Sequence, residues 1–466
     1  MFEYCSPEDV NVSSAGIVRF LDEMKQKRLH MHAMMILRHG KVLFESSFEP
    51  WSKDNRHMLF SLSKSFTSTA VGFAVQDGLL KTTDRLVDFF PELLTNAPCE
   101  NMRKVTVKNL LTMNTGHKVE PRHLTDEWEK EFVRSYVDFE PGTHFMYNTY
   151  GTFMLSAIVQ KATGRKLTEY LKEKLFVPLG MSPDIWTEES PSGVATGGYG
   201  LNVRVSDIAK LGQFYLQKGR WNGVQLLNEQ WISDAQTPWS DNSPSGGNGD
   251  WGQGYGYQFW MCRPEGVFRG DGAFGQYCIV CPKQDMVIAI NSGVRDMGAV
   301  MQSVWDNILP AVDAPAGDGE QLIVTKTNAF WEDEGLEASD PVLKAEWSGE
   351  YRLAKNEYLM LDGVRADGQR LFFSLGGLKT EIPLCRDVWQ HADLSGGEEE
   401  NAQNLFSKIA VRAARSEGKL LLHVCHTRTP FETLLTLTFL PHGLSITGRR
   451  NVGPEGESAE VIGYKL

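Results

Sequence analysis

The sequence predicts an α+β protein of two domains, because helical and strand patterns alternate up to about residue 310 and only strand patterns follow. The 466 residues are 41% apolar, which is enough for two domains to bury separate cores. Pro315, Gly317 and Gly319 begin a stretch, residues 315–330, that is typical of a linker. We therefore expect one domain at 1–314 and an all-β domain at 331–466.

Composition excludes several classes of partner. The net charge of −12 argues against nucleic acid or an anionic membrane as partner, and no apolar run approaches the length of a membrane span. The first residues lack a basic region followed by an apolar stretch, so no secretory signal is predicted. Seven scattered cysteines suit a reducing compartment. We expect a cytoplasmic protein by default, although a chain that has lost a leader would look the same.

The N-terminal region predicts a helix and a hairpin. Apolar residues recur at helical spacing over 16–27, and two strand patterns, 31–38 and 41–45, flank a turn at His39-Gly40. His30, His32 and His39 lie close in sequence, as metal ligands can. No acidic or cysteine partner stands at ligand spacing, so we interpret them as strand or turn histidines.

Ser61 and Lys64 stand three residues apart in the first turn of a predicted helix that ends near Gly78. Residues i and i+3 share a helix face, so the Lys64 ammonium can lie beside the Ser61 oxygen. The helix N-terminus favours a developing negative charge there. A serine is a poor nucleophile until a neighbouring group takes its proton, which makes this pair a candidate for nucleophilic catalysis.

The Ser-x-x-Lys pattern alone has little weight, since about two chance matches are expected in a chain of this composition. The second match, Ser416 to Lys419, contains Gly418 between two strand patterns and predicts a hairpin turn. An N-cap serine with a solvated lysine would explain the first match equally well. The surrounding segments have to decide between a catalytic pair and a helix cap with a solvated lysine.

Downstream, a Pro-Gly turn at residues 141–142 precedes a helix that ends near Gly164, and another helix begins at Ser206. The glycines of residues 196–200 have neither the spacing nor the lysine of a phosphate-binding loop. Residues 251–260 are dense in glycine and aromatic residues, which suits a strand edge lining a cleft. Cys278 and Cys281 lie on a predicted strand and should face opposite sides, as core cysteines.

The C-terminal region consists of short strand patterns at near-regular spacing, typical of a small barrel or sandwich. Its clearest runs are residues 348–353, 358–361, 370–375, 420–424, 434–439 and 459–462. His423, Cys425 and His426 cluster in sequence without a partner motif, so we interpret them as surface strand and turn residues.

Several motifs occur together, in one order, over residues 10 to 310. They are Phe-Ser-x-Ser-Lys at 60–64, Leu-Leu-Thr-Met-Asn-Thr-Gly at 110–116, Pro-Gly-Thr-x-x-x-Tyr at 141–147, Arg-Val-Ser-Asp-Ile-Ala at 204–209 and Gly-Ala-Phe-Gly-Gln-Tyr at 272–277. In these motifs the chain resembles the serine β-lactamase and DD-peptidase superfamily, and most closely its class C-like branch of related hydrolases and esterases. The resemblance implies an antiparallel sheet flanked by helices, with the Ser61 helix buried between them.

The resemblance also implies roles for three residues. Ser61 would be the acylated nucleophile, Lys64 its general base or proton relay, and Tyr147 the tyrosine that shuttles protons to the leaving group. Tyr147 is preferred to Tyr150 because it follows Pro-Gly-Thr at the family's spacing. We expect the nearby Lys64 ammonium to lower the pKa of the Tyr147 phenol.

Two departures from the family pattern bear on the substrate. Thr149 replaces the asparagine that grips a substrate carbonyl, and Asp271-Gly272-Ala273 replaces the Lys-Thr-Gly of the strand at the edge of the cleft. An aspartate there would repel a penicillin carboxylate. The oxyanion hole should combine the Ser61 N–H with one N–H within Gly272 to Phe274.

The expected function is therefore a serine hydrolase that cleaves a neutral or amine-bearing ester or amide, in a small molecule or short peptide, without metal or cofactor. The alternatives are a penicillin-binding or ligand-sensing protein that stays acylated, and a scaffold with a dead site. The C-terminal domain could cover the cleft, restrict substrate size or form an oligomer contact. A homo-oligomer is therefore a further expectation.

Overall fold

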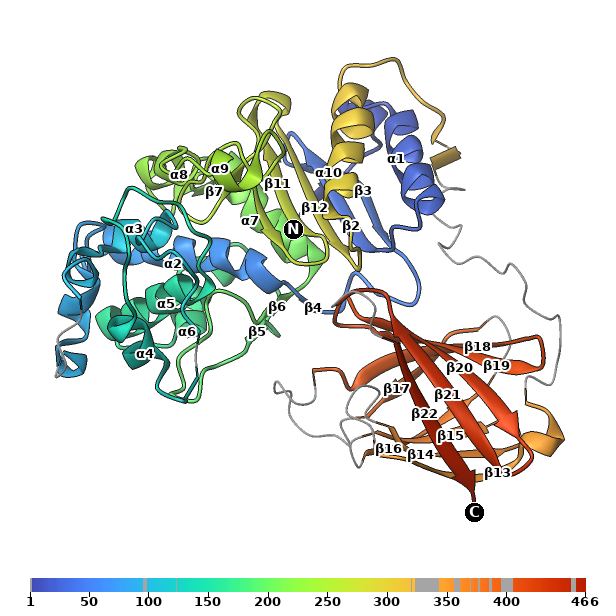
Figure 1. Ribbon diagram of the computed structural model, residues 1–466. Helices are drawn as coiled ribbons and strands as arrows, with labels where there is room; N and C mark the ends of the chain where they lie inside the picture. The colour runs from blue at the N-terminus through green and yellow to red at the C-terminus, as the bar shows by residue number, and fades with distance from the viewer. Residues whose placement is uncertain are drawn as a thin grey trace.

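The structure, a computed structural model, describes residues 2–94, 99–122, 124–319, 321–322, 343–355, 361–368, 370–375, 378–384, 388–394, 405–453 and 458–466. A mixed sheet with helices on both faces forms the N-terminal part, and an antiparallel barrel forms the C-terminal part (Figure 1). Most of the predicted linker lies outside the described residues, and so do residues 331–342.

The central sheet has seven strands in the order β1-β3-β2-β12-β11-β10-β9. In that order their bounds are Glu3–Tyr4, Lys41–Ser47, Met31–Arg38, Met286–Ser292, Gln276–Cys281, Phe268–Gly272 and Trp260–Met261. All neighbours pair antiparallel except β1, which pairs parallel with β3. The antiparallel sheet expected from the resemblance is confirmed, with β1 as a short parallel addition at one edge.

Successive side chains of β2 point to opposite faces of the sheet and pack into two separate cores. Met34 and Ile36 pack under α1 (Ser14–Gln26) and α10 (Met297–Ser303), whereas Met35 and Leu37 face the larger cluster on the other side. On that side α7 (Val205–Leu216) lies against β2, β11 and β12. Cys278 and Cys281 belong to different clusters, so the predicted opposite faces are confirmed.

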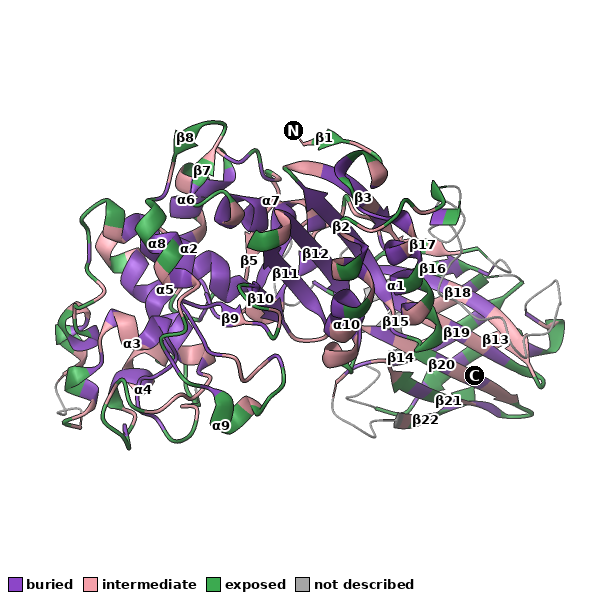
Figure 2. Ribbon diagram, turned by 90° about the horizontal axis from the view of Figure 1, so that it is seen from above, coloured by how far each residue is buried: buried purple, intermediate pink, exposed green. Residues whose placement is uncertain are grey.

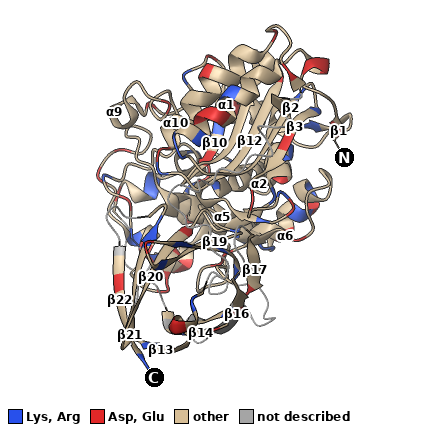
Figure 3. Ribbon diagram, turned by 90° about the vertical axis from the view of Figure 1, so that its right-hand side faces the viewer, with Lys and Arg blue, Asp and Glu red and all other residues tan. Residues whose placement is uncertain are grey.

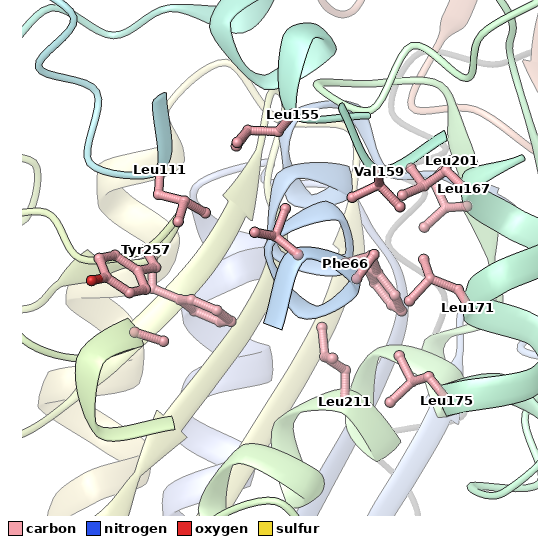
Figure 4. Packing of buried hydrophobic residues seen from close by; sticks show 14 of the residues in the cluster. Phe66, Leu111, Leu155, Val159, Leu167, Leu171, Leu175, Leu201, Leu211 and Tyr257 are labelled. Atoms are coloured by element: carbon pink, nitrogen blue, oxygen red, sulfur yellow. The ribbon is translucent and has the colours of Figure 1, made fainter. Parts of the chain in front are cut away.

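A helical layer beyond α7 contains α2 (Ser63–Gln76), which contacts α5 (Thr149–Thr163) and α6 (Leu167–Leu171). Every residue of α2 from Ser63 to Ala74 is buried (Figure 2). Figure 4 shows Phe66 of α2 among Val159 of α5 and Leu211 of α7. The buried positions of α2 include Ser, Thr and Lys side chains as well as apolar ones, so the helix is covered on all sides, as the resemblance implied.

The remaining short elements complete this domain. They are α3 (Val107–Leu111), α4 (Trp128–Arg134), α8 (Glu229–Ala235), α9 (Ser243–Gly246), β4 (His57–Met58), β5 (Trp186–Thr187), β6 (Leu201–Val203), β7 (Arg220–Trp221) and β8 (Val224–Gln225). The strand edge predicted at 251–260 is wrong over most of its length, since only Trp260 enters a strand. Residues 251–259 form a loop with left-handed backbone at Gly254 and Gln258, which breaks strand pairing.

The C-terminal domain is a ten-stranded antiparallel sheet in the order β16-β15-β14-β13-β22-β21-β20-β19-β18-β17. From β13 to β22 the bounds are Gly349–Leu353, Leu361–Asp367, Arg370–Leu375, Leu378–Pro383, Gln390–Asp393, Lys408–Ser416, Lys419–His426, Glu432–Leu440, Gly443–Arg450 and Ser458–Lys465. The terminal strands β16 and β17 also contact each other, which nearly closes a barrel. The hairpin turn predicted at Ser416 to Lys419 is confirmed, with left-handed Glu417 and Gly418.

The barrel contacts the N-terminal domain through the loop between β19 and β20 and the residues after β21 (Figure 1). The Met58 N–H of β4 donates to the Arg428 carbonyl at 2.8 Å. The Arg295 Nε donates to the Asn451 carbonyl at 2.7 Å, and the Asn451 Nδ2 donates to the Gly293 carbonyl at 3.0 Å. The second domain is thereby held beside the segment that leads into α2.

Charges of both signs are interspersed on the side of the molecule seen in Figure 3. Within the described residues, no helix combines the length and the apolar character that crossing a membrane requires.

Candidate active site

Ser61 lies in a tight 3-10 turn, Phe60–Leu62, that leads directly into α2. The Lys64 Nζ donates to the Ser61 Oγ at 3.0 Å, as the three-residue spacing predicts. Phe60 has a left-handed φ of 49°, an uncommon conformation for a bulky residue, directly before Ser61. Ser61 remains partly exposed.

Lys64 is buried, with 1% of its surface exposed, which excludes the alternative of a solvated lysine. Its Nζ also donates to the Gly198 carbonyl at 2.7 Å and to the Thr149 Oγ1 at 3.4 Å. Burial lowers the pKa of Lys64 to about 7, although the Glu120 and Asp271 carboxylates oppose the shift. A large fraction of the protein therefore holds a neutral amine at Lys64 near pH 7, next to the serine hydroxyl.

Tyr147 lies next to Ser61 and Lys64. Its ring lies 4.8 Å from the Lys64 Nζ, and it stacks on Trp260 with ring centroids 5.3 Å apart. Burial and the Asp271 carboxylate raise the pKa of Tyr147, and a hydrogen bond with Ser61 offsets only part of that rise. The lowered phenol pKa expected from the sequence is thus not found, and Lys64 is the group whose pKa lies near neutrality.

Thr149 begins α5, and its position follows from the cap of that helix. The Asn148 side chain accepts from the Gly151 N–H at 2.8 Å, so this amide points into the helix end and not towards Ser61. The Glu120 carboxylate accepts from the Thr149 N–H, which fixes the residue whose hydroxyl faces Lys64. Thr149, and not Asn148, is therefore the residue of this turn that reaches the site.

The strand β10 lies against the Ser61 turn at a distance that only glycine permits. A Cβ on Gly272 would lie 1.9 Å from the Leu59 carbonyl oxygen, and one on Gly270 would lie 2.4 Å from the Ser65 Oγ. Gly272 pairs with Gln276, so Ala273 and Phe274 form the turn into β11, both partly exposed. The residues expected to complete an oxyanion hole thus lie directly beside the Ser61 turn.

The Asp271 carboxylate is hydrogen-bonded by two neighbouring side chains. The Arg269 Nε donates to its Oδ2 at 2.9 Å, and the Trp251 Nε1 donates to the same oxygen at 3.1 Å. Arg269 is fully buried and Asp271 is 7% exposed. The repulsion of a carboxylate expected from the sequence assumed an isolated aspartate, and the guanidinium beside it cancels most of that charge.

An aromatic cluster joins the second domain to the site. The ring of Phe274 lies 5.2 Å from Phe60 and 5.6 Å from Phe431, which follows the turn between β19 and β20. Phe431 also lies 6.1 Å from Phe60. The barrel therefore contributes a side chain to the aromatic cluster that includes Phe60, the residue before Ser61.

Sequence reasoning missed Glu120, Arg269, Gly198 and Phe431. The pairing of Arg269 with Asp271 had a signal, since residues two apart on a strand share a face. Glu120, Gly198 and Phe431 had none, because each reaches the site from a loop whose path depends on the whole fold.

Comparison with known proteins agrees with this geometry. The family model for beta-lactamase matches residues 19–312. The chain belongs to the beta-lactamase family. Among curated relatives of this family member, a 6-aminohexanoate-dimer hydrolase of Paenarthrobacter ureafaciens is 25% identical over 55% of this chain and 71% of its own. A lovastatin esterase of Penicillium rubens is 28% identical over 30% of this chain and 42% of its own.

A solved structure of similar fold spans both domains of this beta-lactamase family member. It is the octameric penicillin-binding protein homologue from Pyrococcus abyssi, with a TM-score of 0.51 and 19% identity. The match covers 87% of this chain and 97% of that one. The fold likeness therefore includes the C-terminal barrel as well as the family domain, and the hydrolase and esterase relatives support a hydrolase.

Proposed function

We propose that this protein is a serine hydrolase that cleaves an ester or amide through an acyl-enzyme on Ser61. The observation that carries the proposal is the 3.0 Å contact from a buried amine, Lys64, to the serine hydroxyl. A lysine with a pKa of about 7 can take the serine proton at neutral pH, which an ordinary lysine cannot. The hydrolase and esterase relatives support the same reaction class.

In the proposed acylation, neutral Lys64 accepts the Ser61 proton as the oxygen attacks the substrate carbonyl carbon. The backbone N–H of Ser61 and one from the turn after Gly272 stabilise the oxyanion. Tyr147 stays neutral and passes a proton from Lys64 to the leaving oxygen or nitrogen, because its hydroxyl bonds Ser61 and its ring lies beside the amine. Water then hydrolyses the ester on Ser61 by the reverse proton path.

The substrate class follows from the surroundings of the serine. The charge of Asp271 is paired by Arg269, so neither a free cation nor a free anion is directed at the substrate from β10. The rings of Phe60, Phe274 and Phe431 suit an apolar group on one side of the scissile bond. We propose a small neutral ester or amide, with the barrel limiting its size.

Turnover of p-nitrophenyl esters, followed by fluorophosphonate labelling and mass spectrometry of the modified peptide, tests the proposal. We expect steady turnover and a label on Ser61, with both lost in Ser61→Ala. A stable penicillin adduct without turnover would instead indicate a ligand-binding protein, and no adduct with any probe would indicate a dead site.

Tyr147→Phe separates the proton shuttle from a structural role. The loss of the hydroxyl should lower kcat by about a hundredfold or more, with the fold intact. Tyr150→Phe is the matched control, because this tyrosine lies three residues on and packs its ring against Trp128. Equal activity in the two variants would remove Tyr147 from the mechanism.

A further inference from the structure

Side chains with metal-binding atoms gather where the outer face of the barrel meets β2, away from Ser61. His30 and His32 come from the start of β2, whereas His423 and Cys425 lie two residues apart on β19 and so share a face. Glu432 begins β20 directly opposite Cys425. Two histidine groups that looked unrelated in the sequence thus meet across the boundary between the domains.

Glu432 lies at the centre of this group. Its carboxylate lies 2.8 Å from the His423 Nε2, 3.0 Å from the His30 Nδ1 and 3.7 Å from the His32 Nε2. The ligand atoms of His423, Cys425 and Glu432 all lie within 4.8 Å of one another. Glu432 is 2% exposed, and His32 and Cys425 are fully buried.

The hydrogen bonds behind His32 determine which of its nitrogens carries the proton. The His57 Nδ1 lies 3.0 Å from the Met58 carbonyl oxygen, so it must be the protonated nitrogen of that ring. The His57 Nε2 then accepts from the His32 Nδ1–H at 3.0 Å.

The His32 Nε2 is consequently left with a lone pair that faces a Glu432 oxygen. This atom is buried and has no hydrogen-bond partner. A lone pair and a carboxylate repel each other in a dry site, and a buried polar atom without a partner is unfavourable. A cation between the two converts the repulsion into coordination.

We propose that this boundary binds one zinc ion, held by the His32 Nε2, the His423 Nε2, the Cys425 thiolate and the Glu432 carboxylate. Nitrogen, sulfur and carboxylate oxygen are the ligands that zinc takes in closed four-coordinate sites, with ligand atoms about 3.3–3.8 Å apart. The His32–Glu432 distance already has this value, whereas the 2.8 Å His423–Glu432 contact has to lengthen when the ion enters between them. Zinc replaces the proton of the Cys425 thiol, which is released to solvent.

The groups around the ligands fit the same site. His57 orients His32 through its ring nitrogen, as outer partners of metal-bound histidines do. His30 hydrogen-bonds Glu432 and fixes the carboxylate. Because the ligands come from both domains, the bound ion would fasten the barrel to β2, and through the His32–His57 hydrogen bond to β4. The site is independent of the proposed hydrolase reaction.

Metal analysis of the purified full chain, with any affinity tag removed, tests the proposal. After incubation with zinc and gel filtration we expect about one zinc per chain, and a melting temperature that rises with zinc concentration. Cobalt in place of zinc should give a thiolate-to-cobalt charge-transfer band in the near ultraviolet. A wild-type chain that retains no zinc, shows no melting shift and gives no cobalt band would overturn the proposal and leave a hydrogen-bonded network only.

Replacing single proposed ligands shows where the ion binds. Cys425→Ser should abolish the cobalt band, and His32→Asn should weaken zinc binding about tenfold or more. The matched controls Cys99→Ser and His39→Asn lie outside the group and should bind as the wild type does. A cobalt band that persists in Cys425→Ser would place any bound metal elsewhere and refute the site. If a variant fails to fold, the zinc stoichiometry and melting shift of the wild type still decide.

Discussion

Replacing Lys64 with methionine tests the central electrostatic argument, because methionine fills a similar volume without the charge. The buried amine has a pKa of about 7, against an ordinary value of 10.5. That difference corresponds to about 5 kcal/mol at most. The unfolded chain holds more protons than the native state between these two pH values, so wild-type stability rises with pH across this window.

The size of the effect follows from the same values. At pH 7 the buried amine opposes folding by about 4 kcal/mol, and at pH 9 by about 2 kcal/mol. Lys64→Met removes this cost but leaves the Gly198 carbonyl without its donor, which costs about 1–3 kcal/mol. We expect a variant without activity that is more stable than the wild type by about 1–3 kcal/mol at pH 7.

Urea unfolding of both proteins at pH 7 and pH 9 measures the difference. The advantage of the variant should shrink by about 2 kcal/mol between the two pH values, because methionine does not titrate. Lys172→Met, at an exposed position of the same domain, is the control and should show no such change. A stability difference that is equal at both pH values would refute the assignment of a low pKa to Lys64.

Three further predictions concern the same site. The value of kcat/KM should rise with pH through about 7, as neutral Lys64 forms, and a pH–rate profile measures it. Gly272→Ala should cost about 1–3 kcal/mol of stability in urea unfolding together with most activity, because its Cβ meets backbone. Gly298→Ala, whose Cβ makes only ordinary van der Waals contacts, should be neutral or better. Arg269→Leu should cost about 3–5 kcal/mol by leaving Asp271 buried and unpaired, and adding Asp271→Asn should recover part of it, by the same assay.

Local patterns were enough to predict the features that depend on neighbours in sequence. The spacing of Ser61 and Lys64 defines a shared face on any helix, so their contact needed no knowledge of the fold. The hairpin at Glu417 and Gly418 and the opposite faces of the β11 cysteines are local in the same sense. The order of the family motifs along the chain indicated that these segments belong to one fold.

Features that depend on long-range packing could not be predicted. The pKa of Lys64 is low because the helix around it is buried on all sides, a property of the assembled layers. The phenol pKa of Tyr147 was expected to fall next to an ammonium, but burial outweighs that neighbour. Glu432 and His32 are separated by 400 positions in the numbering, so neither sequence neighbourhood showed that they meet.

The glycines of β10 have a consequence for how the protein admits a substrate. Because Gly270 and Gly272 place this strand in direct contact with the Ser61 turn, a side chain added at either glycine would push the turn and the strand apart. The loop 251–259 is also held by backbone contacts, because Tyr255 exchanges hydrogen bonds with Ser240 and the Gln258 N–H donates to the Leu111 carbonyl. Mutational libraries that aim to widen substrate range should therefore leave both the strand and this loop intact and vary the side chains of Phe274 and Phe431.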